Sequence, residues 1–537
     1  MMPASSKLTG KNWHPSRLLA YNALPGHQDF DSTTFDAKST AETRTDFFDR
    51  SLTSRRYALV GVTCSSIFSC ICIIAGSVTL ANYGISGVTP LSIVEYHDVM
   101  IMYLRPMELS VRGEILTLIL DLIVTLCTES IGFIHGISLR SALASESRLR
   151  FNTNLRLLTA ARGWYNPNGA LLNGISAVLL TISYSSASLI ICQDYQVTLA
   201  GGSFESISIA GFPLLILGIA LLLQVMIALL AMWAVKILTW SSSPFDLTAA
   251  LVHHTQLTPS TLRCMRHVSD LDTYGGPAKP TETQPSALHA HPSIRKVVIS
   301  LWVMVAACAV WGALVMYIWG HFPTNKTFSP SPLTLQMWSF LGSGLSNSIA
   351  YFMPSIGLKG WVLLLVNIAV LIVNVIRDER RWRCATKREG LRVATNPLKP
   401  IFAHPICLIL FIAKPFLHWM FGLSFSLALT AFDENITALL VTMYTAQIWN
   451  LCIALFIFSS FFTFIALRRP CGPQPAAYGH LQTLANLVDE WSPVMWWGHK
   501  EDGIPYCHAG TSDHPLPDVK MDCVYAGSGA GSAGPFS

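Results

Sequence analysis

The chain has 537 residues, of which 51% are hydrophobic and 12% are charged, and its formal net charge is +5. Soluble domains carry about 25% charged residues. This composition and a mean hydropathy of +0.45 therefore exclude an ordinary soluble protein and favour one that crosses a membrane several times. Nucleic-acid binding requires a basic face or a recognisable motif, and the sequence contains neither, so no nucleic-acid partner is expected.

Residues 1–56 are polar, with eight Lys/Arg and six Asp/Glu, and are expected to form a largely disordered cytoplasmic segment. The first apolar run begins at Tyr57, which is too far along the chain for a secretory signal peptide. Because this run follows Arg55 and Arg56, it is expected to insert as a signal anchor with its amino-terminal end inside.

Eight apolar runs are long enough for membrane helices, which need about 20 apolar residues. They cover residues 57–82, 114–139, 170–192, 207–238, 297–320, 357–376, 401–431 and 437–467. The sequence thus predicts an all-α integral membrane protein with eight transmembrane helices. A semi-polar stretch at residues 333–355 leaves a ninth helix open.

The distribution of basic residues predicts the orientation. With the amino terminus inside, the inner loops 140–169, 239–296 and 377–400 hold five, five and eight Lys/Arg. The outer loops 83–113, 193–206, 321–356 and 432–436 hold two, zero, one and zero. Lys and Arg are enriched in cytoplasmic loops, so both termini are expected in the cytoplasm. The two glycosylation sequons then fall outside: Asn325 is the candidate acceptor, and Asn435 lies too close to the membrane.

The order of helices and loops repeats, which predicts two parallel four-helix units at 57–238 and 297–467. Each unit has an outer loop of about thirty residues, a basic inner loop and a short acidic outer loop, the last containing Asp194 and Glu205 or Asp433 and Glu434. Units with an even number of helices are related by an axis along the membrane normal.

The linker 239–296 is expected to be cytoplasmic. Helix starts are predicted at Ser243-Pro244 and Thr258-Pro259, because proline is favoured in the first turn. Residues 274–292 are rich in Pro, Gly and Thr and are interpreted as a flexible connector.

The segment 468–537 is expected to be an acidic cytoplasmic tail, with seven Asp/Glu against two Lys/Arg from Cys471 onward. Residues 477–491 place apolar side chains at helical spacing and predict one short helix, with tryptophans packed against it. The histidines and cysteines of the tail (His480, His499, Cys507, His508, His514 and Cys523) lack the paired spacing of structural zinc sites. No metal and no cofactor are predicted.

Three stretches of the tail carry a resemblance: GPQPAAYGHLQTLANLVDEW at 472–491, WWGHK at 496–500 and CHAGTSDHPLPDVKMDCVYAG at 507–527. They resemble the carboxy-terminal signature of a group of filamentous-fungal multi-pass membrane proteins of unassigned function. WSSSPFD at 240–246, and Arg388–Pro397 followed by His418-Trp419, resemble other segments of the same group. The resemblance implies an accessory role in a secondary-metabolite pathway, and no functional residue can be carried over from it.

Polar residues within the apolar runs form the candidate site. Asp121 and Glu129 lie on one face of the second run, with Thr125 between them, and Lys414 and His418 lie four residues apart in the seventh. Charges within a membrane cost about 2.5–3.5 kcal/mol each on insertion scales, so they are expected to face the bundle interior and to be paired. Asp121 is the expected partner of Lys414, because the two match best in depth. The functional interpretation is a proton- or ion-linked path lined by these four residues. The alternatives are a purely structural ion pair and misplaced helix boundaries.

These features predict an integral protein of the plasma membrane or an endomembrane, with the lipid bilayer as its only certain partner. Its activity is unassigned. A secondary transporter with a site between the two halves and a membrane-embedded enzyme are the alternatives, although the sequence contains no nucleotide-binding, metalloprotease or hydrolase motif.

Overall fold

A computed structural model describes residues 53–83, 88–96, 106–154, 159–197, 203–260, 262–270, 276–321, 337–343, 366–393, 404–433 and 436–527. All of these belong to one compact unit, Arg44–Ser537. The glycosylation candidates Asn325 and Asn435, most of the possible ninth helix and residues 357–365 of the sixth apolar run lie outside them.

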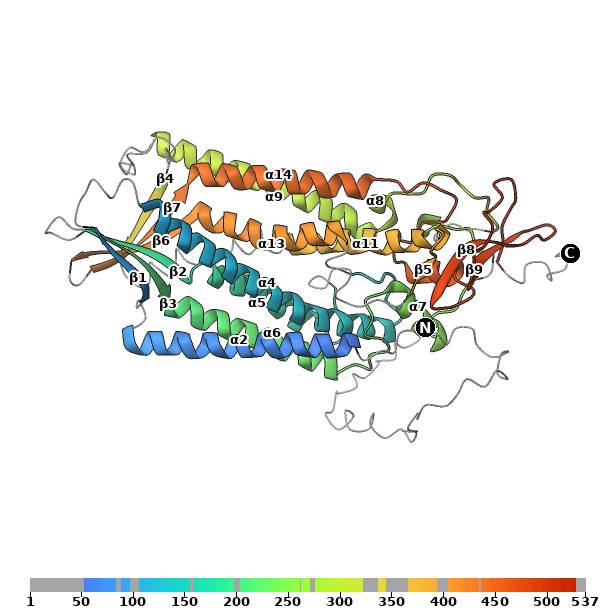
Figure 1. Cartoon of the computed structure of the whole chain (residues 1–537), viewed down its shortest axis with the longest axis horizontal. Coiled ribbons are helices and arrows are strands. Elements are labelled where there is room, and N and C mark those ends of the chain that lie inside the picture. Colours follow the sequence, from blue (N-terminus) through green and yellow to red (C-terminus); the bar gives the residue numbers. More distant parts are fainter. Residues whose placement is uncertain are drawn as a thin grey trace, which may run out of the picture. The chain divides into compact units, whose positions relative to one another are not determined.

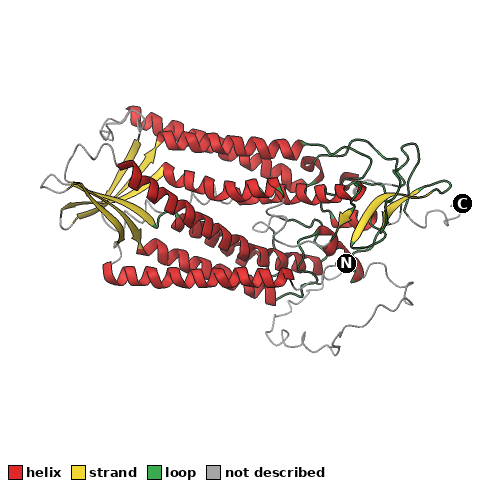
Figure 2. Ribbon diagram, in the orientation of Figure 1, coloured by secondary structure: helices red, strands yellow, loops and turns green. Residues whose placement is uncertain are grey.

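Long apolar helices dominate this unit (Figures 1 and 2). Seven of them, in the described residues, are long and apolar enough to cross a membrane. These spans lie in α2 (Thr53–Tyr83), α4 (Pro106–Ser145), α5 (Ala170–Ala187), α6 (Gly211–Trp233), α9 (Pro292–His321), α13 (Pro405–Ser424) and α14 (Thr445–Leu467). The prediction of a mostly helical multi-pass membrane protein is therefore confirmed. Of the sixth expected run, the structure describes 366–376, and residues 370–376 of it form the first part of α11 (Val370–Trp382).

In the first half, α2 and α6 pack closely because small residues line their contact. The Ser69 hydroxyl donates to the Gly218 carbonyl at 2.6 Å. A methyl group on Gly76 would lie only 2.6 Å from the backbone nitrogen of Leu215. Small residues let membrane helices approach closely enough for van der Waals contact, since lipid supplies no hydrophobic driving force between helices.

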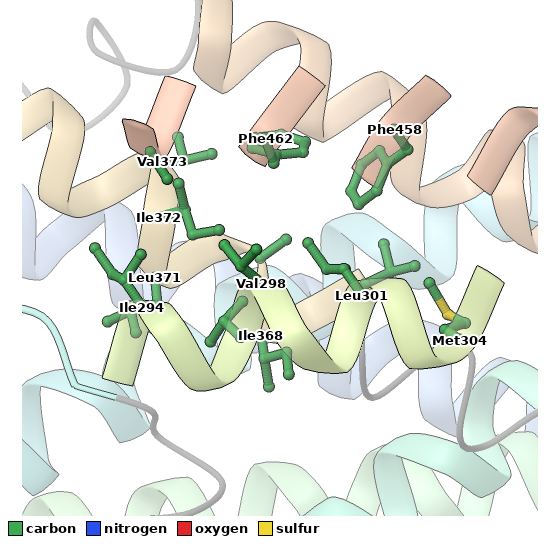
Figure 3. Packing of buried hydrophobic residues seen from close by; sticks show 14 of the residues in the cluster. Ile294, Val298, Leu301, Met304, Ile368, Leu371, Ile372, Val373, Phe458 and Phe462 are labelled. Carbon is green, nitrogen blue, oxygen red and sulfur yellow. The ribbon is translucent and has the colours of Figure 1, made fainter. Parts of the chain in front are cut away.

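In the second half, α9 and α14 form the corresponding antiparallel pair. The Trp302 indole N–H donates to Thr463 Oγ1 at 3.0 Å, and Ser459 Oγ donates to the Leu301 carbonyl at 3.4 Å. Residues 366–373, which include the first turn of α11, pack against both helices. Figure 3 shows Ile368, Leu371, Ile372 and Val373 beside α9, with Phe458 and Phe462 of α14 nearby.

The expected outer loops contain strands that the sequence analysis did not predict. One three-stranded antiparallel sheet comprises β1 (Val88–Tyr96), β3 (Ser203–Ala210) and β2 (Ile191–Val197), in that order. The other comprises β4 (Met337–Ser343), β7 (Ile436–Tyr444) and β6 (Phe425–Asp433). The expected helices 207–238, 401–431 and 437–467 are accordingly too long at the ends where these strands lie. Polar and apolar residues alternate in β3 (SFESISIA), which is the strand signal that was missed.

The short acidic outer loops are therefore hairpins. In the first sheet, Tyr195 of β2 pairs with Glu205 of β3. In the second, Asp433 at the end of β6 pairs with Ile436 at the start of β7. The possible ninth helix at 333–355 contains β4 in its described part, so residues 337–343 are a strand and not a helix.

The basic loops, the linker and the tail fold together. The linker contributes α7 (Pro244–His253), η1 (Val268–Asp270) and α8 (Ala287–Ala290), and the stretch after α11 contributes η3 (Arg383–Thr386) and β5 (Leu391–Arg392). The tail contributes α15 (Leu481–Leu487), β8 (Val494–Glu501) and β9 (His508–Ser512). The strand order is β5-β8-β9. A shared core includes Phe245 of the linker, Trp382 of α11 and Trp497 of the tail.

Two expectations for the linker are corrected. Helix α7 begins at Pro244 as predicted, with Ser243 as its N-cap, but no helix starts at Thr258 within the described stretch 254–260. The described residues from 276 onward also do not behave as a free connector. Ala278 and Tyr525 exchange two backbone hydrogen bonds of 3.1 and 2.9 Å, and Gln284 N donates to the Pro470 carbonyl at 3.1 Å. Pairing with the tail satisfies backbone groups that an isolated linker would leave to water.

The junction after α11 holds the tail against both halves. Glu379 Oε2 accepts hydrogen bonds from the backbone N–H groups of Ala477 and Tyr478 at 2.9 and 2.8 Å. On the same turn, Asp378 Oδ2 accepts from the side chain of Asn152, in the inner loop of the first half, at 2.8 Å. Asn152 N in turn donates to the Gly479 carbonyl at 2.8 Å. Two buried carboxylates of α11 thus connect the two halves and the tail.

A candidate polar site at mid-span

The centre of the site is an ion pair that joins the two halves. Lys414 Nζ of α13 bonds to Glu129 Oε1 of α4. Glu129 lies sixteen residues from either end of the span Gly113–Ser145, and Lys414 is the tenth residue of α13. Helices α4 and α13 lie in contact (Figure 1). Each helix therefore brings a charged residue to the middle of its span.

The two partners differ in exposure. The side chain of Lys414 is 4% exposed, whereas that of Glu129 is 45% exposed. Glu129 lies on the same face of α4 as Leu122 and Leu126, which are 38% and 48% exposed. The lysine is therefore fixed inside the bundle, and the carboxylate lies at the edge of the contact between α4 and α13.

A hydroxyl network lies beside the pair. The Tyr184 hydroxyl of α5 donates to Thr125 Oγ1 at 3.2 Å and lies 3.0 Å from Thr128 Oγ1. The hydroxyls of Thr125 and Thr128 donate to backbone carbonyls of α4, at 2.7 and 3.0 Å. Asp121, one turn before Thr125, is 1% exposed. Three polar positions of α4 at helical spacing thus share the face that meets Tyr184.

His418 connects this network to α13. Its ring stacks on that of Tyr184 with centroids 4.3 Å apart and planes inclined by 15°. His418 and Lys414 are four residues apart, so both project from the same face of α13. Between them, Pro415 is buried within the helix. Proline has no N–H for the α-helical ladder, which frees a backbone carbonyl in the turn that carries the lysine.

Of the four residues proposed from the sequence, Glu129 pairs with Lys414 and His418 stacks on Tyr184, whereas Asp121 is buried on the face of α4 that meets Tyr184, eight residues before Glu129. The partner assigned to Lys414 was wrong, however, because the carboxylate bonded to its ammonium is that of Glu129 and not of Asp121. In the expected run 401–431, Lys414 lies thirteen residues, or about 20 Å, from the cytoplasmic end at Ile401, and this depth was taken to place it toward the outer half of the membrane. Helix α13 covers Pro405–Ser424, so Lys414 lies at its middle, level with the middle of α4.

Tyr184 and Thr128 were missed. The run TISYSS around Tyr184 is the most polar part of its span, and this local polarity was the signal that a partner lay nearby. A tyrosine that is 3% exposed needs a partner for its hydroxyl. The sequence does not show that this partner would be a threonine of α4.

A second charged cluster lies in the tail, around Asp489. Lys500 Nζ donates to Asp489 Oδ2 at 2.9 Å, His508 Nε2 donates to the same oxygen at 3.0 Å, and Thr511 N donates to Oδ1 at 2.6 Å. Gly510 leaves room for the carboxylate, since a methyl group there would lie 2.4 Å from Asp489 Oδ1.

The electrostatics of this cluster favour its charged forms. Burial alone would raise the pKa of Asp489, but the hydrogen bonds from His508, Lys500 and Thr511 hold it well below its usual range. Burial would likewise lower the pKa of His508, whereas the Asp489 carboxylate and the Cys264 thiol raise it to about 10. His508 is therefore an imidazolium at neutral pH. In the described part of the chain, no group of three His, Cys, Asp or Glu side chains is arranged to hold a metal ion.

No protein-family model matches the chain, and comparisons with curated proteins and with solved structures found no match.

Proposed function

We propose that the chain is a proton-linked transport protein of a membrane, with Glu129 as the protonated group. The observation that carries this proposal is the Glu129–Lys414 pair, which lies at mid-span, joins the two halves and leaves the carboxylate 45% exposed. Ionisable residues within membrane spans are costly and typically mark ion or proton pathways.

The chemistry follows from the unequal exposure of the partners. Lys414 is buried, so its ammonium requires a nearby anion as long as the two halves stay together. Protonation of Glu129 removes that anion and weakens the contact between α4 and α13. A proton arriving at the Glu129 carboxylate would thus favour separation of the halves, and its release would favour their return. This is the coupling that alternating access requires.

The duplicated architecture is part of the same proposal. In each sheet, the strand from the long loop (β1 or β4) pairs with the second strand of the hairpin (β3 or β7). The strand orders are therefore equivalent, β1-β3-β2 and β4-β7-β6. In each half the first helix packs antiparallel on the last, α2 on α6 and α9 on α14. These correspondences support two parallel repeats, with eight spans and the ion pair at their interface.

The test uses the purified full chain in proteoliposomes on a solid-supported membrane. A step to more acidic pH should produce a transient charge displacement in the wild type, and Glu129→Gln should abolish it. Glu114→Gln, at the start of the same span, is the matched control and should leave the signal intact. A signal of equal size in Glu129→Gln would refute the proposal. Loss of stability without any wild-type signal would indicate a structural ion pair.

The orientation has its own test. We propose that both termini face the cytoplasm, because the three basic loops carry eighteen Lys/Arg and the four opposite loops carry three. Protease added to sealed right-side-out vesicles should spare tags at residues 1 and 537. Digestion of either tag would contradict the eight-span topology.

The pathway role is a separate proposal, and it rests on the resemblance of residues 472–491 and 496–500 to the fungal membrane-protein group. Deletion of the gene should change the profile of secreted secondary metabolites without affecting growth. An unchanged profile would remove this role and leave the transport proposal intact.

A further inference from the structure

In each half, basic side chains gather at one end of the pair formed by the first and last helices, which are α2 and α6 in the first half and α9 and α14 in the second. In the first half these are Arg55 and Arg56, at the start of α2, and Lys236, just after α6, and all three are exposed. The Arg55 guanidinium lies 5.9 Å from the ring centroid of Trp240. This contact places the start of α2 beside the segment that follows α6, so the three cations belong to one surface.

The second half repeats the arrangement. Arg295 and Lys296, at the start of α9, and Arg468 and Arg469, just after α14, are all exposed. The hydrogen bond between Trp302 and Thr463 fixes the register of the two helices. At 1.5 Å per residue, Arg295 lies about 10 Å and Arg468 about 8 Å beyond that bond, on the same side of it. The four cations therefore also form one surface.

Carboxylates of the described residues do not neutralise these cations. Among the residues that the structure describes, none of the seven forms an ion pair with Asp or Glu. Arg148, which is also exposed, does pair with Glu146, at 2.8 Å. The two basic ends are therefore free to bind an anion from outside the chain.

Apolar faces continue from each basic end along the helices. In the first half, Val60 of α2 is 60% exposed and Trp233 of α6 is 66% exposed. In the second half, Ile299 of α9 is 54% exposed and Phe464 of α14 is 69% exposed. A soluble phosphate would use only the cations. A ligand with an anionic head and two long acyl chains would use both the cations and the apolar faces.

We propose that each basic end binds the headgroup of an anionic phospholipid whose acyl chains lie along the adjoining helix pair. Basic residues next to membrane spans attract anionic lipids with about 1 kcal/mol each, and tryptophan favours the headgroup level of the bilayer. The two sites lie at equivalent places in the two halves, one on α2 and α6 and the other on α9 and α14. This inference does not depend on the proposed transport activity.

Native mass spectrometry of the full chain in detergent tests the proposal, with phosphatidylserine and phosphatidylcholine of identical acyl chains as probes. The wild type should retain two molecules of phosphatidylserine in preference to phosphatidylcholine. Arg468→Gln with Arg469→Gln should weaken one of the two sites roughly thirtyfold, since each arginine contributes about 1 kcal/mol. Arg468→Lys with Arg469→Lys should retain it, which separates charge from folding.

The matched control removes the same charge elsewhere. Lys387 and Arg388 are exposed between η3 and β5 and belong to neither helix pair, and Lys387→Gln with Arg388→Gln should leave both lipids bound. An equal loss in this control would show general electrostatic attraction and overturn the proposal. Equal retention of the two lipids would overturn it as well. Displacement of the bound lipid by inorganic phosphate would show a site for soluble anions and exclude the lipid assignment.

Discussion

Glu129 and Asp489 are both carboxylates bonded to a lysine, yet the two sites are built in opposite ways. In the tail the carboxylate is the fixed centre, held by Lys500, His508 and Thr511 and fitted against Gly510. In the membrane span the lysine is the buried partner, and the carboxylate is 45% exposed. A fixed, multiply bonded carboxylate stays charged and stabilises a fold. A carboxylate bonded to a single lysine is the one that we propose to exchange a proton.

The largest expected effect is the loss of folding free energy when the tail carboxylate Asp489 is removed. Asp489→Ala should cost the tail about 3 kcal/mol of folding free energy, because it leaves Lys500 and His508 without their shared anion. Limited proteolysis of the full chain should then cleave within 472–527 much faster than in the wild type. Asp513→Ala is the control, since Asp513 forms an exposed pair with His514 and should be dispensable. Equal protease resistance of the Asp489 variant would break the comparison.

A smaller effect is expected from the membrane pair. Lys414→Met should destabilise the membrane unit by about 1–3 kcal/mol, the cost of leaving a polar partner unsatisfied. Because the accessible Glu129 can take up a proton, the loss should be below that of Asp489→Ala. Adding Glu129→Gln to Lys414→Met should restore most of the thermal stability, which a double-mutant cycle measures. Simple additivity would show that the two residues are not coupled.

The pH dependence of the tail should report His508. Its pKa is raised to about 10 from an ordinary value of 6.5, so the stabilisation it provides is complete below pH 6.5 and is lost as the pH rises through 10. The lowered pKa of Asp489 acts in the opposite direction, and its contribution is lost on acidification below its ordinary value of 3.8. Resistance of the tail to proteolysis should therefore fall steadily from pH 6.5 to pH 10. His508→Gln should flatten this slope, and an unchanged slope would contradict the assignment.

The smallest effect is expected from the hydroxyl network beside the membrane pair. Tyr184→Phe removes the hydroxyl that contacts Thr125 and Thr128 but keeps the ring on which His418 stacks. A neutral hydrogen bond contributes about 1 kcal/mol, so the melting temperature should fall slightly. Tyr184→Leu should cost more, because the stacking is lost too. Identical losses in the two variants would mean that the hydroxyl contributes nothing.

Local composition in the sequence was enough to place most of the membrane helices. Apolar runs of about 20 residues can be recognised one segment at a time. Each span must be apolar enough to contact lipid and must satisfy its own backbone hydrogen bonds, whatever its neighbours are. The same reasoning identified Asp121, Glu129, Lys414 and His418, because a charge inside such a run needs a partner wherever the helix packs. The apolar residues Leu481, Leu484 and Leu487 of the tail were likewise expected on one face, and all three are buried.

The tertiary structure decided which of these residues meet. Lys414 pairs with Glu129 because α13 begins at Pro405 and gives way to β6 at Phe425, and these boundaries set the depth of every residue on the helix. The strands escaped detection because β6 and β7 are as apolar as the helices they continue, and their pairing is visible only between segments distant in the chain. The linker is ordered by hydrogen bonds to the tail across more than 180 residues, as between Gln284 and Pro470. Local patterns therefore determined where the apolar spans lie. The strand boundaries and the partners of the polar groups depended on packing between segments that are distant in the chain.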